Sequence, residues 1–220
     1  MIVCVIIRSM TVEGRQQIIL PWRDSGCLYR KRHFDYLYKY YSEEFDVVIG
    51  DNDGDFNRSA ARNAGVDKST SDVVVIIDAD NYIEHKNIHG AVKVAKRRDS
   101  LVKPFLYFGY LTEESTNYFY STKSFDKTKA SFINPPDKDF SGGAYVMKKS
   151  LWKDIGGMDE GFVGWGAEDD AFHLLCQAKL GKTRYTEGID YHLYHPAHRV
   201  TSEYNYNKLI KEYVNGNKSS

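Results

Sequence analysis

Short apolar runs along the chain predict strands, and stretches with helical spacing fall between them. Residues 73–77 are five branched apolar residues without polar alternation, as expected of a strand that is buried on both faces of a parallel sheet. The other predicted strands cover residues 2–7, 17–20, 46–49, 106–110 and 143–147.

Apolar residues at helical spacing predict amphipathic helices. Their expected buried faces are Phe34, Leu37, Tyr38 and Tyr41; Ile88, Ala91, Val92 and Ala95; Ala171, Leu174, Leu175 and Ala178; and Tyr206, Leu209, Ile210 and Tyr213. Ala60, Ala61 and Ala64 form a small-residue face that allows close packing on a sheet. Gly181 fits the C-cap of the helix that begins near Ala171. The alternation of strands and helices predicts an α/β fold with a mostly parallel sheet, whose ligand crevice lies beyond the carboxyl ends of its strands.

Composition narrows the class of protein. The 220 residues include 30 basic and 30 acidic side chains, whereas a protein that coats nucleic acid or an anionic membrane carries a basic excess. The three cysteines, Cys4, Cys27 and Cys176, form no Cys-x-x-Cys pair, which disfavours a disulfide framework and suits a reducing compartment. No apolar stretch approaches the roughly 18 residues of a membrane span. We therefore expect a soluble, cytoplasmic protein.

Acidic side chains follow two of the predicted strands. Asp78 and Asp80 come directly after the buried strand, where paired carboxylates can hold a divalent cation and leave room for substrate phosphates. A solvated turn is the alternative for this pair. Asp51 follows an earlier strand and is placed to contact a base or ribose, with an ordinary turn as its alternative.

The densest feature covers residues 156–170, with five glycines, one tryptophan and five acids. Acids at a helix N-terminus are stabilised by the helix dipole, which accounts for one or two of these carboxylates but not for the glycine and tryptophan pattern before them. Glu168 and Asp169 diverge by about 100° on a helix. We therefore expect one to bind a hydroxyl and the other to act as a general base.

Three histidines, His192, His195 and His198, lie within seven residues. A buried structural histidine is the ordinary explanation for any one of them. A zinc site would need three or four nitrogen or sulfur ligands, and no cysteine lies nearby in the sequence. One histidine that completes a carboxylate-based Mn²⁺ site fits better.

Together these motifs resemble the GT-A glycosyltransferases, in particular the galactosyltransferase and polypeptide N-acetylgalactosaminyltransferase group. The matching elements, in the order of that family, are Pro21-Trp22-Arg23, Phe56-Asn57-Arg58, Asp78-x-Asp80, Gly142-Gly143, Gly156-Gly157-x-Asp159-Glu160, Gly164-Trp165-Gly-x-Glu168-Asp169 and a late His-x-x-His. They cover about residues 17–198. The resemblance implies a Rossmann-like three-layer sandwich with a mostly parallel central sheet. It also implies one domain over 1–220, with a nucleotide-binding half at about 1–100, an acceptor and catalytic half at about 101–198, and a C-terminal lid and helix at 199–220.

The resemblance also implies roles for individual residues. Asp80 and His195 resemble the ligands of Mn²⁺ or Mg²⁺, and His192 falls where galactosyltransferases place a methionine ligand. Asp169 resembles the catalytic base, Glu168 an acceptor-binding carboxylate, and Trp165 an aromatic platform for a sugar. The residues that resemble the donor pocket are Pro21, Trp22, Arg23, Asp51, Phe56, Arg58, Asp78, Gly142 and Gly143.

The implied reaction moves a hexose (Glc, Gal or GalNAc) from a UDP-sugar to an acceptor hydroxyl on a glycan, a protein or a hydroxylated base in phage DNA. Retaining N-acetylgalactosaminyltransferases have Glu-Asn where this chain has Glu168-Asp169, so the pair favours inversion. The compact size is similar to that of cytosolic transferases of bacteria and phages, which implies the host cytoplasm for a phage enzyme. The alternatives are a non-catalytic nucleotide-sugar-binding protein and a metal-dependent nucleotidyltransferase. A non-catalytic binding protein would be expected to lose the catalytic base or a metal ligand, and this chain keeps both. A nucleotidyltransferase would not need the Gly-Trp-Gly-x-Glu-Asp element that this chain contains.

The neutral average charge hides a segregation along the chain. Residues 154–170 hold six acids and no lysine or arginine, while basic clusters lie at 30–32, 93–98 and 148–153. The sequence therefore predicts an acid-rich cleft and a basic exterior. Convergence of the basic clusters on one side of the cleft would favour a DNA acceptor. Residues 197–207 follow the last expected ligand and are predicted to form a lid that metal and donor order.

Overall fold

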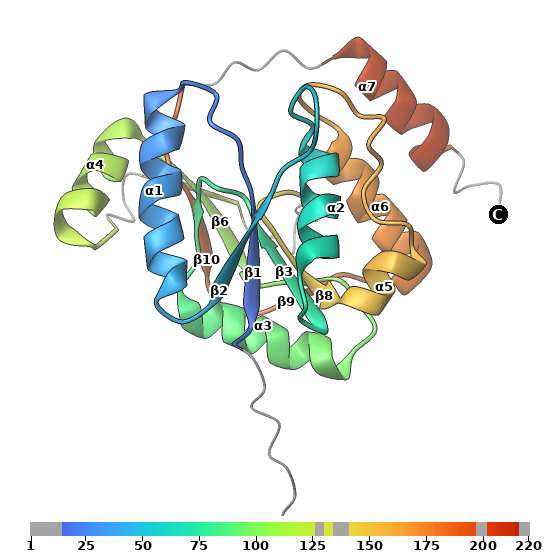
Figure 1. Ribbon diagram of the computed structural model, residues 1–220, viewed down its shortest axis with the longest axis horizontal. Helices are drawn as coiled ribbons and strands as arrows, with labels where there is room; N and C mark the ends of the chain where they lie inside the picture. The colour runs from blue at the N-terminus through green and yellow to red at the C-terminus, as the bar shows by residue number, and fades with distance from the viewer. Residues whose placement is uncertain (1–14, 126–129, 134–140, 197–201, 216–220) are drawn as a thin grey trace, which may run out of the picture.

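The computed structural model describes residues 15–125, 130–133, 141–196 and 202–215. A six-stranded sheet in the order β2-β1-β3-β8-β5-β9 forms its centre (Figure 1). The strands are β1 (Gln17–Pro21), β2 (Asp46–Gly50), β3 (Val73–Ile77), β5 (Val102–Lys103), β8 (Ala144–Lys148) and β9 (Arg184–Tyr185). Of these six, β8 alone runs antiparallel to its neighbours. The predicted α/β fold with a mostly parallel sheet is confirmed, while the predicted strand at 2–7 lies outside the described residues.

A second sheet brings the late part of the chain to the end of β3. Its order is β4-β10-β6-β7, with β4 (Asn81–Tyr82), β6 (Tyr107–Leu111), β7 (Ala130–Ile133) and β10 (Ile189–His192). The predicted strand at 106–110 is β6, shifted by one residue. In β10, His192 pairs with Asn81 of β4, and Asn81 directly follows the two aspartates after β3. Backbone pairing thus sets the histidine segment against the Asp78–Asp80 turn.

Helices cover both faces of the central sheet, which makes the expected three layers (Figure 1). One core cluster joins β3 to α1 (Leu28–Ser42) and α3 (His85–Arg97), through residues such as Val75, Leu37 and Ile88. The other joins the alternate β3 residues to α2 (Arg58–Lys68), α5 (Lys149–Asp154) and α6 (Glu168–Leu180), through residues such as Ile76 and Phe172. Because the side chains of a strand alternate between faces, the all-apolar β3 serves both layers.

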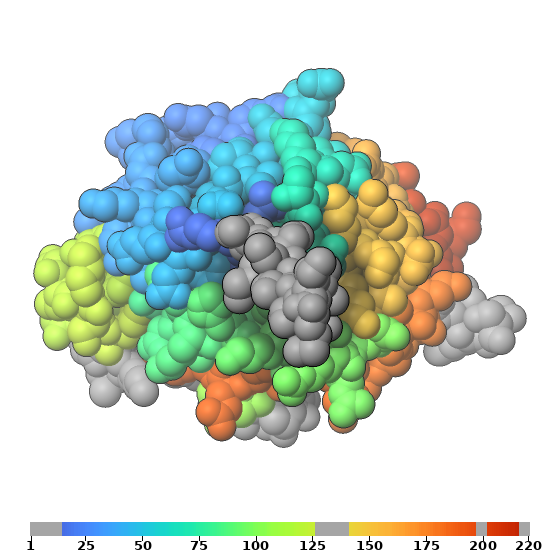
Figure 2. All heavy atoms as spheres, turned by 60° about the horizontal axis from the view of Figure 1, so that its bottom comes forward, coloured from blue at the N-terminus to red at the C-terminus, as the bar shows by residue number. Residues whose placement is uncertain are grey.

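Helices also mark the two ends of the molecule. In Figures 1 and 2, α1 and α4 (Glu113–Thr122) lie side by side at one end, and α5 and α6 lie at the other. The last described elements of the chain are α7 (Glu203–Lys208) and the π-helical turn η3 (Leu209–Val214). No helix within the described ranges is long and apolar enough to cross a membrane.

Two predicted helix faces are confirmed only in part, since Leu209 and Tyr213 do pack with Ala171 and Leu174 while other members of these faces are exposed. In α6 the buried residues are Glu168, Ala171, Phe172, His173 and Cys176, and Ala178 is exposed. In α7, Tyr206 is 56% exposed while Asn205 is fully buried. In both helices buried polar side chains have partners that the apolar pattern does not reveal. The faces predicted for α3 and around Leu37 and Tyr41 of α1 are confirmed, as is Gly181 at the C-cap of α6.

Helix α2 approaches the sheet through glycine. A Cβ on Gly50 would lie 2.2 Å from the backbone oxygen of Ala61, and one on Gly65 would lie 2.3 Å from Cγ2 of Ile19. Ala60 and Ala64 are only half-buried, so the close contact uses Ala61 and Gly65 rather than the full predicted alanine face. This packing fixes α2, which carries side chains of the site, directly over β1 and β2.

Gly50→Ala is expected to destabilise the fold by roughly 1–3 kcal/mol, because the added methyl group meets backbone atoms that must move. Gly90→Ala is the matched control, since a Cβ at Gly90 of α3 meets nothing within 4 Å and alanine is favoured in helices. Urea denaturation of both variants measures the difference. Equal urea midpoints for the two variants would show that α2 can move away from the sheet without loss of stability.

Candidate active site

Three potential metal ligands meet just beyond the end of β3. One ligand atom each from Asp80, His192 and His195 lies within 4.8 Å of the others. Nε2 of His195 is 3.2 Å from Oδ2 of Asp80, and Nε2 of His192 is 3.9 Å from the same oxygen. A carboxylate oxygen with two imidazole nitrogens is a donor set that suits Mn²⁺. The structure thus brings together the three residues that the sequence predicts as ligands.

The backbone around these ligands is fixed by buried contacts. The N–H of Leu193 donates to the backbone oxygen of Asp80 at 2.8 Å, so the two ligand segments are joined directly. His33 of α1 bonds through Nε2 to the backbone oxygen of Tyr194 at 2.7 Å, and the Tyr194 N–H donates to Thr116 at 2.9 Å. Burial lowers the pKa of His33 to about 4, so this histidine stays neutral at physiological pH.

The electrostatics of Asp80 suit a cation ligand. Burial of this carboxyl raises its pKa, but the two neighbouring histidines outweigh that effect and hold the pKa of Asp80 well below its usual range. The group therefore remains a carboxylate at any physiological pH. An ionised carboxylate is the state of Asp80 that binds a hard divalent cation.

A buried arginine that the sequence analysis did not single out joins two of the predicted acids. Arg62 of α2 is 0% exposed, and its Nη2 donates to Oδ1 of Asp78 at 2.7 Å while Nη1 donates to Oδ1 of Asp169 at 2.8 Å. The Tyr145 hydroxyl donates to the same oxygen of Asp169. Burial raises the pKa of Asp169, but Arg62 and Arg58 outweigh it and lower that pKa overall. Asp169 is therefore held as a carboxylate.

A second arginine pairs with Glu168. Nε of Arg58 lies 2.6 Å from Oε1 of Glu168, whose side chain is 5% exposed, and burial raises the pKa of Glu168. Asp169 instead points toward the glycine turn, because a Cβ on Gly142 would lie 3.2 Å from its Oδ2. These two acids therefore lie in different surroundings.

These pairs refine the prediction of an acid-rich cleft with a basic exterior, because some basic side chains lie inside the cleft. The acid-rich segments are as predicted, but arginines of α2 come from a part of the chain more than 100 residues earlier and neutralise them. The signal that could have revealed Arg62 is its place among Ala60, Ala61, Ala64 and Gly65 on a helix face expected to pack on the sheet. A charged residue on such a face needs a buried partner.

Some of the residues expected in the donor pocket gather at the ends of β1 and β2, while Asp78 follows β3 and the Gly142-Gly143 pair precedes β8. Arg23 forms an ion pair with Asp51 at 2.7 Å and lies 5.7 Å from the centre of the Phe56 ring. It also donates to the backbone oxygens of Asn52 and Gly54. Trp22 follows Pro21 and stacks on Phe34 of α1 with ring centres 4.6 Å apart, so it packs the loop against that helix.

The Gly142-Gly143 turn rests on two buried ionisable side chains, Lys103 and Asp190, that the sequence analysis also missed. Lys103 is fully buried, and its Nζ donates to the backbone oxygens of Ser141 at 2.6 Å and Gly142 at 2.8 Å. Burial lowers its pKa to about 7. A Cβ on Gly143 would lie 2.5 Å from Oδ2 of buried Asp190. Glycine is therefore required at 143 by close approach as well as by its positive φ of 85°.

The C-terminal helices hold the loop that carries Trp165. Asn205 donates to the backbone oxygens of Val163 and Gly166, both at 3.0 Å. The Tyr213 hydroxyl donates to Asp159 at 2.8 Å. Trp165 remains 36% exposed, as an aromatic platform requires. Of the predicted lid, residues 197–201 lie outside the described part, and Ser202–Lys208 form the N-cap and body of α7, which is docked on this loop.

Comparison with protein families matches residues 29–156 to glycosyl transferase family 2. The chain belongs to glycosyl transferase family 2. Residues 124–196 also match the N-terminal domain of galactosyltransferase, a range that includes the glycine turn and the two candidate ligand histidines. A search of curated proteins returned no match. The expectation of a glycosyltransferase enzyme is confirmed, which removes the nucleotidyltransferase alternative.

Solved structures similar to this family 2 glycosyltransferase share its fold at low sequence identity. A Drosophila β1,4-galactosyltransferase 7 mutant in complex with manganese, UDP-Gal and xylobiose has 13% identity and a TM-score of 0.56, over 89% of this chain and 79% of that one. GalNAc-T7 with UDP, GalNAc and Mn²⁺ has 13% identity and a TM-score of 0.57, over 93% of this chain and 50% of that one. The predicted GT-A, Rossmann-like fold is thereby confirmed.

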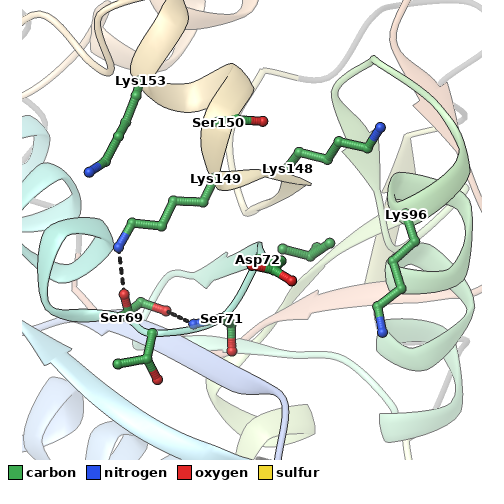
Figure 3. Close-up of a pocket in the computed structure, with 10 residues that line it drawn as sticks. Ser69, Ser71, Asp72, Lys96, Lys148, Lys149, Ser150 and Lys153 are labelled. Carbon is green, nitrogen blue, oxygen red and sulfur yellow. Dashed lines mark hydrogen bonds between the residues drawn. The ribbon is translucent and has the colours of Figure 1, made fainter. Parts of the chain in front are cut away.

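Two basic clusters of this family 2 glycosyltransferase converge, but not at the site. Lys96, Lys148, Lys149 and Lys153 surround a cavity of about 640 Å³ that also touches Val73, the first residue of β3 (Figure 3). Asp78 and Asp80 follow the other end of that strand, about 16 Å away at about 3.3 Å per residue. Lys149 is engaged with the Ser69 backbone oxygen at 2.5 Å. These two basic clusters therefore do not converge on one side of the cleft, which is the arrangement that would favour a DNA acceptor.

Proposed function

We propose that this glycosyltransferase moves a hexose from a UDP-sugar to an acceptor hydroxyl, with Mn²⁺ or Mg²⁺ held by Asp80, His192 and His195. The observation that carries the proposal is the meeting of these three ligand atoms within 4.8 Å at the end of β3, beside a carboxylate held by Arg62. Support comes from the similar structures, which are complexes with manganese and UDP-Gal, and with UDP and Mn²⁺.

The chain's own residues divide the remaining work. A divalent cation at this site would offset the negative charge that develops on the diphosphate leaving group. Arg23, Asp51 and Phe56 form one cluster at the ends of β1 and β2 and are proposed to hold the nucleotide, with Pro21 and Trp22 shaping that loop and Arg58 beside it. Asp78 and the Gly142-Gly143 turn are proposed to face the donor sugar, since the Asp78 N–H donates to the Gly143 oxygen at 3.0 Å.

Asp169 is proposed as the catalytic base. Its Oδ1 is occupied by Arg62 and Tyr145, while Oδ2 lies toward Gly142. Oδ2 would take the proton of the acceptor hydroxyl as that oxygen forms its bond to the anomeric carbon. The bond between the anomeric carbon and the β-phosphate oxygen breaks, and UDP leaves with the electron pair. Attack opposite the leaving group inverts the anomeric centre, as the Glu168-Asp169 pair favours.

The acceptor is proposed to lie over Trp165, whose ring is exposed enough to stack on a sugar. Glu168 is paired with Arg58 and nearly buried, so it would meet an acceptor hydroxyl together with that arginine. Glc, Gal and GalNAc are the candidate donor sugars. Because the lysines of α3 and α5 surround a cavity at the far end of β3, a glycan or protein hydroxyl is favoured over a hydroxylated DNA base.

A donor-hydrolysis panel tests the proposal. UDP release from UDP-Glc, UDP-Gal and UDP-GalNAc is measured with Mn²⁺, with Mg²⁺ and after chelation. We expect release from one donor above the others and its loss on chelation. Release that is independent of metal, or none with any donor, would contradict the proposal, and a β-linked product from an α-linked donor would establish inversion.

Asp80→Ala is expected to abolish Mn²⁺-dependent UDP binding, because it removes the oxygen that lies nearest both histidines. Asp72→Ala is the matched control, since Asp72 stands before the other end of β3. Isothermal titration calorimetry of UDP with and without Mn²⁺ measures both variants. A titration of Asp80→Ala that matches the unchanged chain would refute the ligand assignment.

A further inference from the structure

Arg30, in the first turn of α1, lies beside the proposed metal ligands. Its Nη2 is 3.3 Å from Nε2 of His195, the same nitrogen that lies 3.2 Å from Oδ2 of Asp80. Arg30 is partly buried. The sequence placed it in a basic cluster at 30–32, of a kind that is more often a solvated helix face.

The three basic residues of this cluster point in different directions. Lys31 pairs with Asp35 at 3.0 Å on the surface of α1. Arg32 donates to Asn117 of α4 at 2.9 Å, with its guanidinium 4.0 Å from the centre of the Tyr120 ring. Arg30 alone of the three reaches the ligand histidine, which gives the chain two built-in controls.

The contact of Arg30 with His195 is with a ring nitrogen that a metal would use. Nδ1 of His195 lies 3.1 Å from the backbone oxygen of Pro196, so Nε2 is the ring nitrogen that faces both Asp80 and Arg30. A metal held by Nε2 and Asp80 would take the place of the contact between this nitrogen and Arg30.

A cation and a guanidinium so close together repel each other unless an anion lies between them. The planar fork of arginine matches phosphate oxygens, and it remains charged at any physiological pH. The first turn of α1 carries no acid, and Cys27 provides no side-chain cap, so the helix dipole adds to the positive potential there. The local charge therefore suits a diphosphate.

The position of Arg30 is held rigidly against the ligand segment. The Tyr29 hydroxyl donates to Glu113 at 2.8 Å, and its ring meets Tyr194 edge-on with centres 5.8 Å apart. His33, one turn further along α1, bonds to the backbone of Tyr194. These contacts fix the start of α1 to residues next to His195, so the backbone that carries Arg30 is already in place beside the site.

We infer that Arg30 binds the diphosphate of the nucleotide-sugar donor and stabilises it as the leaving group. This role rests on the proposed function and adds a diphosphate contact from α1, outside the motifs that the sequence analysis identified. It predicts that Arg30 distinguishes ligands that carry a diphosphate from those that do not.

The test compares Arg30→Ala and Arg30→Lys with Lys31→Ala and Arg32→Ala by calorimetric titration with UDP and with uridine, in the presence of Mn²⁺. Arg30→Ala is expected to weaken UDP binding by roughly 10- to 100-fold, the effect of losing charge-assisted hydrogen bonds, and to leave uridine binding unchanged. Arg30→Lys should lose less, because it keeps the charge without the fork. The two neighbouring variants should bind UDP as the unchanged chain does.

A titration with Mn²⁺ alone, followed by electron paramagnetic resonance, separates this role from a structural one. If Arg30 serves the diphosphate, Arg30→Ala binds Mn²⁺ alone as well as or better than the unchanged chain, because a repelling charge is gone. If Arg30 only props His195, the variant binds Mn²⁺ more weakly, and the inference is overturned. Unchanged UDP affinity in Arg30→Ala overturns this inference alone, whereas no UDP binding by the unchanged chain overturns the proposed function with it.

Discussion

Asp169→Asn is expected to lower turnover by roughly 10²- to 10⁴-fold, the usual contribution of a general base. The amide keeps the size of the side chain and can still accept from Arg62 and Tyr145, but it cannot take a proton from the acceptor. UDP release measures the loss, and calorimetry with UDP and Mn²⁺ is expected to show donor binding intact. Asp99→Asn, at an exposed ion pair with Lys148, serves as the control and should retain full turnover.

The pH dependence of the reaction follows from the same contacts. A base acts only when deprotonated, so activity falls as pH falls through the pKa of Asp169. Because Arg62 and Arg58 outweigh burial and lower that pKa, this group is expected to cause no loss of kcat/KM above about pH 4, the ordinary aspartate range.

Near-normal turnover of Asp169→Asn with intact donor binding would reject the assignment of Asp169 as the base, and the base would then have to be another group.

Arg62→Met is expected to destabilise the fold by roughly 3–5 kcal/mol at pH 7, the cost of removing one partner from a buried ion pair. The substitution keeps an unbranched side chain of similar length but removes the charge that lies between Asp78 and Asp169. Urea denaturation measures the change. Arg97→Met, at the exposed end of α3, is the control and should stay within about 0.5 kcal/mol of the unchanged chain.

A second measurement keeps the Arg62 prediction testable even when the variant folds poorly at neutral pH. In the unchanged chain the lowered pKa of Asp169 contributes stability that is lost as pH falls through that pKa. Burial already raises the pKa of Asp78 in the unchanged chain, and without Arg62 the pKa values of Asp78 and Asp169 both rise, so the stability of the variant increases as pH falls. The deficit of Arg62→Met is therefore expected to shrink between pH 7 and pH 5. A constant deficit, or a cost below about 1 kcal/mol, would show that the pair contributes through packing rather than charge.

The contrast between β3 and α6 shows how far sequence patterns reach. The bounds of β3 are predicted to the residue because both faces of the strand are buried and tolerate no polar side chain. Helix α6 departs from its predicted face because Glu168 and Asp169 are turned inward by ion pairs with Arg58 and Arg62. A hydrophobic pattern predicts which residues are buried only where the buried side chains are apolar. Active sites also bury charged side chains, which such a pattern does not reveal.

The sequence by itself determined the alternation of strands and helices, the acids after β3, and Asp80, His192 and His195 as candidate ligands, which the structure brings together. Such features depend on local periodicity and on motifs whose members fall a few residues apart. The tertiary structure decided which cations neutralise the acids, because Arg62 and Asp169 are 107 positions apart in the chain and only packing of α2 against α6 brings them within 2.8 Å. It also separated Arg30 from Lys31 and Arg32. Charge pairing follows distance in space, and a sequence records only order along the chain.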